Sequence, residues 1–284
     1  MRECVVTIIV THNPDIERFE HVVKSVSKQV RHVIIVDNNS NNKDIIKDLC
    51  SKMNNCETIE LKFNAGIAHA LMIGVRYAID KYSPKWLLFL DDDAILIDEA
   101  LNKVFNMLKK LKAHLSNRIG AILLKNSPGD CSLREVFYGF FSGTLIRSDI
   151  ALKSCCRDDF FLDQADHDLY SKIREQGYLT LRINCKLIDH EPGQRRWIRI
   201  LSDITRKPLD YEPPWRYYYI VRNSTKLLIE RRIDFKTYIH QLMYWGIRIL
   251  FADGIKAFLK SFGLGLMHAL INRFGYLDRN IFEV

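Results

Sequence analysis

The chain has 284 residues, of which 48% are apolar and 27% are charged, and its formal net charge is +8. This composition excludes a wholly disordered chain and is sufficient for one large domain or one domain with an appendage. No window approaches the roughly 18 uninterrupted apolar residues of a membrane span, and the N-terminus lacks the pattern of a signal peptide. We therefore expect a cytoplasmic protein.

Apolar runs and helical patterns alternate along the first part of the chain. The sequence predicts strands over 5–10, 33–36, 58–63 and 86–90, and helices over 16–30, 45–53, 68–82 and 98–111. Most of these strands are apolar on both faces, which is typical of parallel strands covered by helices on both sides. The expected fold is α/β, with a Rossmann-like, mostly parallel sheet flanked by helices.

The second part of the chain has a different character. The stretch "DDFFLDQADHDLYSKIREQGY" predicts an acidic loop entering a helix that stops at Gly177, and a strand pattern follows over 179–190. From about Trp197 the chain is basic, aromatic and mostly helical in pattern. The segment 194–284 has 16 Lys and Arg residues against 8 Asp and Glu residues, which accounts for the whole net charge. We expect an α/β domain over 1–210 and a helical C-terminal region over 211–284.

Polar clusters follow four of the predicted strands, at Thr11–Asn13, Asp37–Ser40, Asn64–Gly66 and Asp91–Asp93. Ligands of parallel sheets bind beyond the carboxyl ends of the strands, so a shared site is expected there. Asp91 and Asp93, one residue apart, can both turn toward a hard divalent cation that carries a diphosphate. The alternative is that the clusters are ordinary turns, and that the three aspartates cap the next helix.

Seven cysteines are spread through the chain without a C-x-x-C pair. Their odd number and spacing are not typical of a zinc site or of a disulfide framework. We expect them to be small core residues in a reducing compartment, with no bond between the adjacent Cys155 and Cys156.

Seven motifs follow one another in a recognisable order: "VTIIVTHNPD", "VIIVDNNS", "NAGIAHALMIG", "LLFLDDDA", "FFSGTLI", "FFLDQADHDLYSKIREQGY" and "LIDHEPG". With the later "YYYIVRNS", the chain resembles the family 2 inverting glycosyltransferases over most of residues 5–225. The likeness is greatest to the branch of rhamnosyltransferases and galactofuranosyltransferases. This resemblance implies the GT-A fold, a nucleotide-binding α/β fold, and a sugar transfer that depends on manganese or magnesium.

The resemblance also implies roles for single residues. The nucleotide and donor sugar would bind at Thr11, Asn13, Asp37, Asn64, Gly66, Asp91 and Asp92. The metal ligands would be Asp91, Asp93 and His190. Asp166 would be the base that removes the proton of the acceptor hydroxyl. Acceptor binding or support would come from Asp163, Asp168, Arg195, Arg196 and Trp197.

The hypothesis from the sequence is an inverting hexosyltransferase that moves a rhamnose- or galactofuranose-like sugar from dTDP or UDP to a glycan or lipid-linked acceptor, in polysaccharide or glycoconjugate synthesis. The alternatives are a sugar nucleotidyltransferase and a non-catalytic membrane-associated scaffold. The basic, apolar tail is expected to lie on an anionic membrane at its cytoplasmic face, or to pack on protein, including a second copy in a homo-oligomer. Nucleic acid is not an expected partner, because no recognition motif accompanies the charge.

Overall fold

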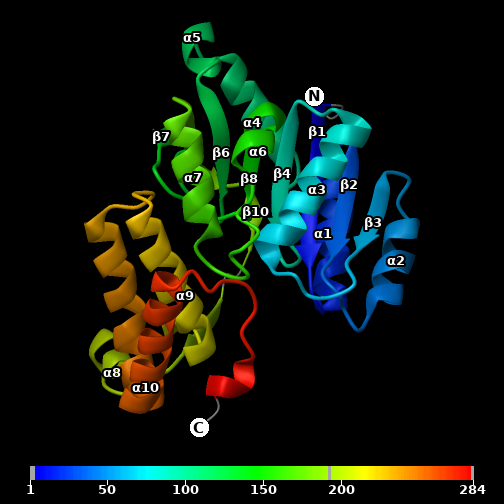
Figure 1. Ribbon diagram of the computed structural model, residues 1–284. Helices are drawn as coiled ribbons and strands as arrows, with labels where there is room; N and C mark the ends of the chain where they lie inside the picture. The colour runs from blue at the N-terminus through cyan, green and yellow to red at the C-terminus, as the bar shows by residue number, and fades with distance from the viewer. Residues whose placement is uncertain (1–3, 191–192, 283–284) are drawn as a thin grey trace. The chain divides into compact units, whose positions relative to one another are not determined.

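The computed structural model describes residues 4–190 and 193–282 (Figure 1). The chain divides into two compact units. Unit 1 comprises Met1–Asp158 and Leu169–Glu191, and unit 2 comprises Asp159–Asp168 and Pro192–Val284. The boundary expected between residues 210 and 211 falls inside unit 2.

Unit 1 is built on an eight-stranded, mostly parallel sheet with the order β3-β2-β1-β4-β8-β6-β9-β7. Its strands are β1 (Val5–Thr11), β2 (His32–Asp37), β3 (Cys56–Glu60), β4 (Trp86–Asp91), β6 (Ile119–Lys125), β7 (Leu133–Glu135), β8 (Thr144–Arg147) and β9 (Leu179–Lys186). The pairs β1–β2, β1–β4, β2–β3 and β6–β9 are parallel, whereas β8 is antiparallel to both of its neighbours and β7 is antiparallel to β9.

Helices follow the strands of unit 1 in the alternating order that the sequence predicts (Figure 1). They are α1 (Ile16–Ser27), α2 (Lys43–Ser51), α3 (Ile67–Tyr82), α4 (Ala100–Lys109), α5 (Ala113–Ser116) and α6 (Ser148–Ser154). A further helix, α7 (Ala165–Glu175), begins in unit 2 and continues in unit 1. The prediction of an α/β fold with a mostly parallel sheet is thus confirmed.

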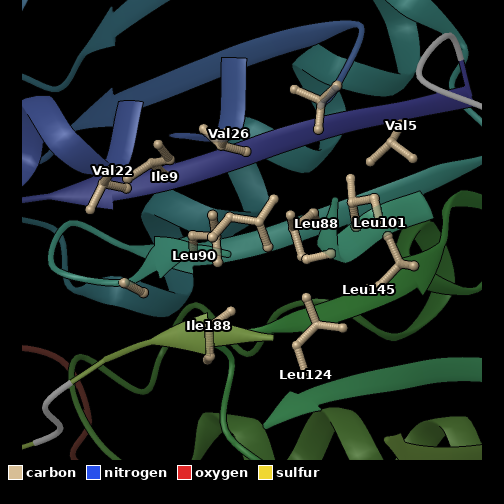
Figure 2. Close-up of a cluster of buried hydrophobic side chains, with 14 of the residues drawn as sticks. Val5, Ile9, Val22, Val26, Leu88, Leu90, Leu101, Leu124, Leu145 and Ile188 are labelled. Atoms are coloured by element: carbon tan, nitrogen blue, oxygen red, sulfur yellow. The ribbon is translucent and has the colours of Figure 1, made fainter. Parts of the chain in front are cut away.

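The core of unit 1 lies between the sheet and its helices (Figure 2). Val5 and Ile9 of β1 belong to the same buried cluster as Val22 and Val26 of α1 and Leu88 of β4. The apolar spacing of α1 aims one face at the sheet, and burying each such side chain contributes about 1.5–3 kcal/mol. This packing fixes the strand ends that carry the polar clusters.

A second, two-stranded sheet connects two distant parts of unit 1. In it, β5 (Ile95–Leu96) pairs antiparallel with β10 (Ile188–Asp189). The backbone N–H of Ile97 also donates to the carbonyl oxygen of Leu187 at 3.0 Å. This pairing places the residues after β10 beside the loop that follows β4.

Unit 2 is mostly helical, as the sequence predicts. Its elements are β11 (Gln194–Arg196), α8 (Leu201–Thr205), β12 (Leu209–Tyr211), α9 (Pro214–Ile229), α10 (Phe235–Leu270) and a 3-10 helix (Arg279–Phe282). The long α10 is interrupted at Gly254, whose φ of 87° is readily adopted only without a side chain. No helix in the described ranges has both the length and the apolar character that crossing a bilayer requires.

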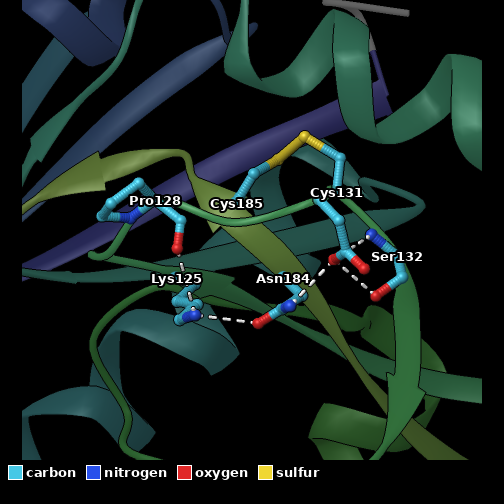
Figure 3. Close-up of a disulfide and its surroundings, with 7 residues drawn as sticks. Lys125, Pro128, Cys131, Ser132, Asn184 and Cys185 are labelled. Carbon is cyan, nitrogen blue, oxygen red and sulfur yellow. Dashed lines mark hydrogen bonds between the residues drawn. A yellow bond between two sulfur atoms is a disulfide. The ribbon is translucent and has the colours of Figure 1, made fainter.

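The expectation that the cysteines form no disulfides is wrong, although Cys50, Cys156 and Cys185 are buried core residues as expected. Disulfides join Cys50 to Cys56 and Cys131 to Cys185, and the structure also pairs Cys155 with Cys156. The Cα atoms are 5.3 Å apart in the first pair and 4.5 Å apart in the second. Figure 3 shows how Cys185 of β9 meets the loop before β7, where the N–H of Cys131 donates to the carbonyl oxygen of Asn184. Sequence spacing missed the pair of Cys131 and Cys185 because the pairing of β7 with β9 brings these two residues together from 54 positions apart.

Candidate active site

The carboxyl ends of three neighbouring strands bring predicted site residues together in unit 1. In the sheet register Thr11 of β1 lies opposite Asp37 of β2, and Val10 lies opposite Asp91 of β4. Parallel pairing aligns these ends at one edge of the sheet. The polar clusters that the sequence places after separate strands are therefore neighbours in space.

Asp91, Asp93 and His190 form a compact group of potential metal ligands. One ligand atom from each lies within 4.8 Å of the other two. The Nε2 atom of His190 is 3.1 Å from Oδ1 of Asp93 and 3.5 Å from Oδ2 of Asp91. The alternative of a helix cap for the aspartates does not fit, because α4 begins at Ala100 with Glu99 as its N-cap residue.

Burial and the charges of neighbouring side chains shift the pKa values of Asp91 and His190. Burial raises the pKa of Asp91 to about 6, although nearby His190 opposes the rise. Burial alone would lower the pKa of His190, but its hydrogen bond to Asp93 and the charges of Asp93 and Asp91 raise it instead. Two crowded carboxylates beside an imidazole thus form a site that favours positive charge.

The donor set fits a divalent cation. Two carboxylate oxygens suit hard ions such as Mg²⁺ and Mn²⁺, and one imidazole nitrogen is compatible with a transition metal. The three side chains are partly exposed, so the group is open on one side. An open coordination sphere is what a metal that also binds a substrate phosphate requires.

The side chain of Asp92 is hydrogen-bonded to β1, whereas those of Asp91 and Asp93 lie beside His190. Its Oδ2 atom accepts a hydrogen bond of 2.7 Å from Oγ1 of Thr11. Burial raises the pKa of Asp92, although the hydrogen bond from Thr11 opposes this rise. Asp92 therefore connects the end of β4 to the end of β1 and is not a member of the metal cluster.

Asn13 and Asp37 are bound into the loops after β1 and β2. The N–H of Asn13 donates to Oγ of Ser40 at 2.8 Å, and its side-chain Oδ1 accepts from the N–H of Asn41 at 2.7 Å. The carboxylate of Asp37 is 1% exposed and accepts from the N–H of Ser40. The bond from the Ser40 N–H to the Asp37 carboxylate shapes the loop on which Asn13 rests.

Asn64 and Gly66 belong to a network centred on Asn38. The Nδ2 group of Asn38 donates to Oδ1 of Asn64 at 3.0 Å, and Oδ1 of Asn38 accepts from the N–H of Ala65 at 2.8 Å. Gly66 has a φ of 87° and directly precedes α3, whose first N–H groups form an anion-favouring helix end.

In unit 2, Asp163 lies on the loop that enters α7, and Asp166 follows it within the helix. Both carboxylate oxygens of Asp163 accept from Arg216, at 3.0 and 3.1 Å. Asp166 is in the first turn of α7 and accepts from the N–H of His167 at 2.8 Å. Burial raises the pKa of Asp166, and the neighbouring charge of Asp163 adds to this effect, while His167 opposes it.

Asp168 is a buried residue of the same turn. It is 1% exposed, and its Oδ1 atom is 3.8 Å from Nε of Arg232. Its burial beside Arg232 favours a supporting role for Asp168.

Arg195, Arg196 and Trp197 lie on and after β11, which pairs antiparallel with β12. Arg195 pairs with Asp210 and Arg196 with Asp253, each at 3.5 Å. The indole Nε1 of Trp197 donates to Asp203 at 3.0 Å. All three have exposed side chains in unit 2.

Sequence reasoning missed several polar residues that support the site in unit 1. Asn38 organises the loops after β2 and β3, and Oγ of Ser142 accepts from the N–H of Asp91 at 3.0 Å. Asn126 exchanges hydrogen bonds with the backbone of His190. Arg18 of α1 donates to Asp93 and Asp189. Asn38 and Ser142 carried a signal, because they lie within the motifs "VDNNS" and "FFSGTLI".

Comparison with known proteins adds a family and a curated relative. The family model described as "Glycosyl transferase family 2" matches residues 6–122, which include β1 to β4 and α1 to α4. The dTDP-rhamnosyl transferase RfbF of Shigella flexneri is 23% identical over 265 residues, which are 86% of each chain.

Solved structures resemble this chain in fold. A mannosyltransferase from Pyrobaculum calidifontis, in complex with GDP-Man and Mn²⁺, superposes with a TM-score of 0.58 at 16% identity, over 95% of this chain and 74% of the other. The S. aureus protein TarS, in complex with UDP-GlcNAc, superposes with a TM-score of 0.55 at 14% identity, over 87% of this chain and 72% of the other.

Proposed function

We propose that the chain, a glycosyltransferase with the GT-A fold, moves a rhamnose-like sugar from a pyrimidine nucleoside diphosphate to an acceptor hydroxyl, with inversion and with a divalent metal. The relative named as a dTDP-rhamnosyl transferase favours rhamnose over galactofuranose and dTDP over UDP. The family match favours a sugar transferase over the two alternatives, a sugar nucleotidyltransferase and a non-catalytic scaffold. The acceptor is a glycan or a lipid-linked glycan of a cell-surface polysaccharide pathway, reached from the cytoplasm.

The observation that carries this proposal is the cluster of Asp91, Asp93 and His190 at the carboxyl end of the sheet. These residues would hold Mn²⁺ or Mg²⁺. When bound, the ion stabilises the negative charge that develops on the diphosphate leaving group. The adjacent ends of β1, β2 and α3 supply the remaining nucleotide contacts, with Thr11, Asn13, Asp37, Asn64 and Gly66 in that role and with Asp92 beside the donor.

Asp166 is the proposed base. Its carboxylate accepts the proton of the acceptor hydroxyl as that oxygen forms a bond to the anomeric carbon. The bond from the anomeric carbon to the diphosphate oxygen breaks, and the nucleoside diphosphate leaves with the electron pair. Attack from the face opposite the leaving group inverts the anomeric configuration. A raised pKa suits Asp166 for this role, because a more basic carboxylate takes a proton more readily.

The test is a panel of nucleotide sugars, measured for turnover with manganese, with magnesium and with a chelator. We expect chelator-sensitive release of dTDP from dTDP-rhamnose, restored by added manganese. Asp91→Asn and Asp93→Asn variants should abolish that turnover, while Asp98→Asn, in the exposed stretch just after the cluster, should retain it. Turnover that is indifferent to chelator would contradict the metal part of the proposal, and turnover of a purine donor alone would contradict the donor class.

A second part of the proposal concerns α10. Ile255 and Leu259 are 55% and 58% exposed, and Lys256 and Lys260 beside them are exposed as well. Apolar side chains flanked by cations are typical of a helix that lies on an anionic membrane. Sedimentation with vesicles of anionic phospholipid should fall for an Ile255→Ser, Leu259→Ser double variant. Unchanged sedimentation, with a dimer mass in light scattering that the double variant loses, would favour a homo-oligomer contact instead.

A further inference from the structure

The proposed metal ligands come from two segments that are far apart in the sequence. Asp91 and Asp93 lie at the end of β4 and in the loop after it, and His190 follows β10. The β5–β10 ladder that joins the segments is only two residue pairs long. A ladder this short leaves the separation of the ligands dependent on further contacts.

Arg18 supplies such contacts from a third element, α1. Its Nε atom donates to the carbonyl oxygen of Asp93 at 2.9 Å, and its Nη2 atom donates to the carbonyl oxygen of Asp189 at 2.8 Å. The same Nη2 atom is 3.2 Å from the carboxylate of Asp189. One guanidinium thus binds the backbone of a ligand, Asp93, and the backbone of the residue before a ligand, His190.

The base of the Arg18 side chain is itself fixed. Asp15 caps α1 by accepting a hydrogen bond of 2.8 Å from the N–H of Arg18. The next turns of α1 are held by buried Phe19, Val22 and Val23 against the sheet. A planar guanidinium on an anchored helix holds its acceptors in a defined relative position, which a flexible ammonium group does not.

Charge alone does not account for an arginine at this position. A cation close to a site for a divalent ion repels that ion. The acceptors of Arg18 are two carbonyl oxygens and the carboxylate of Asp189, which also pairs with Lys186 and is not among the proposed ligands. The guanidinium therefore leaves the carboxylates of Asp91 and Asp93 available while it contacts the chain on both sides of the site.

We propose that Arg18 is a positioning residue of the metal site, which holds the loop of Asp91 and Asp93 and the strand end of His190 at the separation that one divalent ion requires. This inference rests on the proposed function of that cluster. It assigns to α1 a part in metal binding although no residue of α1 reaches the ion.

The experiment is a titration of the full chain with Mn²⁺ alone, without donor or acceptor. We expect Arg18→Ala to weaken Mn²⁺ binding about 10- to 100-fold, as loss of a partner that orients ligands typically does. Arg18→Lys should also weaken binding, because it keeps the charge but loses the planar fork. Arg31→Ala is the matched control, since Arg31 also donates to a backbone carbonyl, that of Tyr82, and its removal changes the net charge equally.

Whether Arg18→Ala weakens or strengthens Mn²⁺ binding distinguishes a positioning role of Arg18 from an effect of its charge. If Arg18 acted through charge alone, Arg18→Ala would bind Mn²⁺ as tightly as the wild type or more tightly, and that result would overturn the proposal. Wild-type affinity in Arg18→Lys would overturn it as well, because a point charge would then suffice. Should Arg18→Ala fail to fold in a thermal melt, Arg18→Lys carries the test.

A spectroscopic measurement adds a signal that does not change when the fold is merely less stable. Pulsed EPR of bound Mn²⁺ detects coupling to a ligating imidazole nitrogen. We expect this coupling in the wild type, its loss in His190→Ala, and its loss or marked weakening in Arg18→Ala at saturating Mn²⁺, because the carboxylates still bind while His190 is displaced. Full coupling in Arg18→Ala would contradict the proposal. A wild type that binds no Mn²⁺ would instead contradict the metal-dependent function itself.

Discussion

Two acid-bearing segments of this chain are held in place by different means. In unit 1, Asp91 lies at the end of a buried strand, and the register of the parallel sheet sets its position relative to Thr11 and Asp37. In unit 2, Asp163 lies on a loop whose conformation is set by side chains of α9, and Asp166 follows in the first turn of α7. Backbone pairing in the sheet positions the strand end, whereas the loop depends on side chains of α9 that lie 53 to 61 positions further along the chain.

The loop of unit 2 needs this support because its backbone is strained. Asp163 and Gln164 have φ values of 61° and 67°, in the left-handed region that residues with side chains rarely adopt. Each such residue costs on the order of 1 kcal/mol or more. Asn223 of α9, which is 0% exposed, donates to the carbonyl oxygens of Leu162 at 2.7 Å and Asp163 at 3.0 Å. Together with Arg216, it offsets the strain directly before Asp166.

The largest expected effect comes from the proposed base. Asp166→Asn should lower the turnover number for transfer by about 10²- to 10⁴-fold, because the amide cannot accept the hydroxyl proton. Binding of Mn²⁺ should stay unchanged, since the proposed ligands lie in unit 1. Asp158→Asn, at an exposed position in the same acidic stretch, is the matched control and should keep full activity. Transfer by Asp166→Asn at the wild-type rate would assign the base to another residue.

The pH dependence of transfer sharpens the same assignment. The pKa of Asp166 is raised, so its basic form is lost at a higher pH than for an ordinary aspartate, near 3.9. The transfer rate should therefore fall as the pH drops through the raised pKa of Asp166, which is above the ordinary aspartate value. The rate should recover when the pH is returned to neutral. A profile that stays flat down to pH 4 would show that Asp166 is not the titrating base.

Removing the anchor of the loop should have an intermediate effect on stability and activity. Asn223→Ala leaves two partly buried carbonyl oxygens without their donor, which should lower the free energy of unfolding by about 1–3 kcal/mol. Transfer should fall further than this loss of folded protein explains, because Asp166 follows the released loop. Denaturant unfolding and activity at low temperature measure the two effects. Asn280→Ala, at an exposed asparagine of unit 2, should change neither.

The smallest expected effect concerns Glu212, which shares Arg216 with Asp163. Burial raises the pKa of Glu212 to about 7, although Arg216 opposes this rise. Because the folded-state pKa exceeds the unfolded one, stability from this group is complete below about pH 4.5 and is lost as the pH rises to about 7.

Glu212→Gln removes that titration. The variant should match the wild type near pH 4.5 and exceed it by roughly 1–3 kcal/mol at pH 8, as thermal or denaturant unfolding at the two pH values would show. A variant less stable than the wild type at pH 8 would mean that the ion pair with Arg216 outweighs the cost of burying the Glu212 charge.

Periodicity predicted the first four strands and their helices, because apolar runs and helical spacing are local properties. The strand-end rule then grouped Thr11, Asp37 and Asp91, and the structure places them side by side. His190 was found through its motif, since nothing local indicates that β10 pairs with β5.

Residues that contact the site only in the folded chain could not be predicted in this way. Arg18 and Asn126 are ordinary polar residues in sequence, and their role is visible only in the structure, where they bond to backbone groups of the site. The disulfide between Cys131 and Cys185 was missed for the same reason, as was the hairpin of β11 and β12 that holds Arg195 and Arg196.

The most direct test of the account is a crystal structure of the full chain grown with Mn²⁺ and dTDP. We predict an anomalous difference peak for manganese within coordination distance of Asp91, Asp93 and His190, with the diphosphate oxygens completing its coordination. Nucleotide bound at the strand ends with no manganese at these three residues, or with manganese held elsewhere, would contradict the central claim that this cluster is the metal site of the transferase.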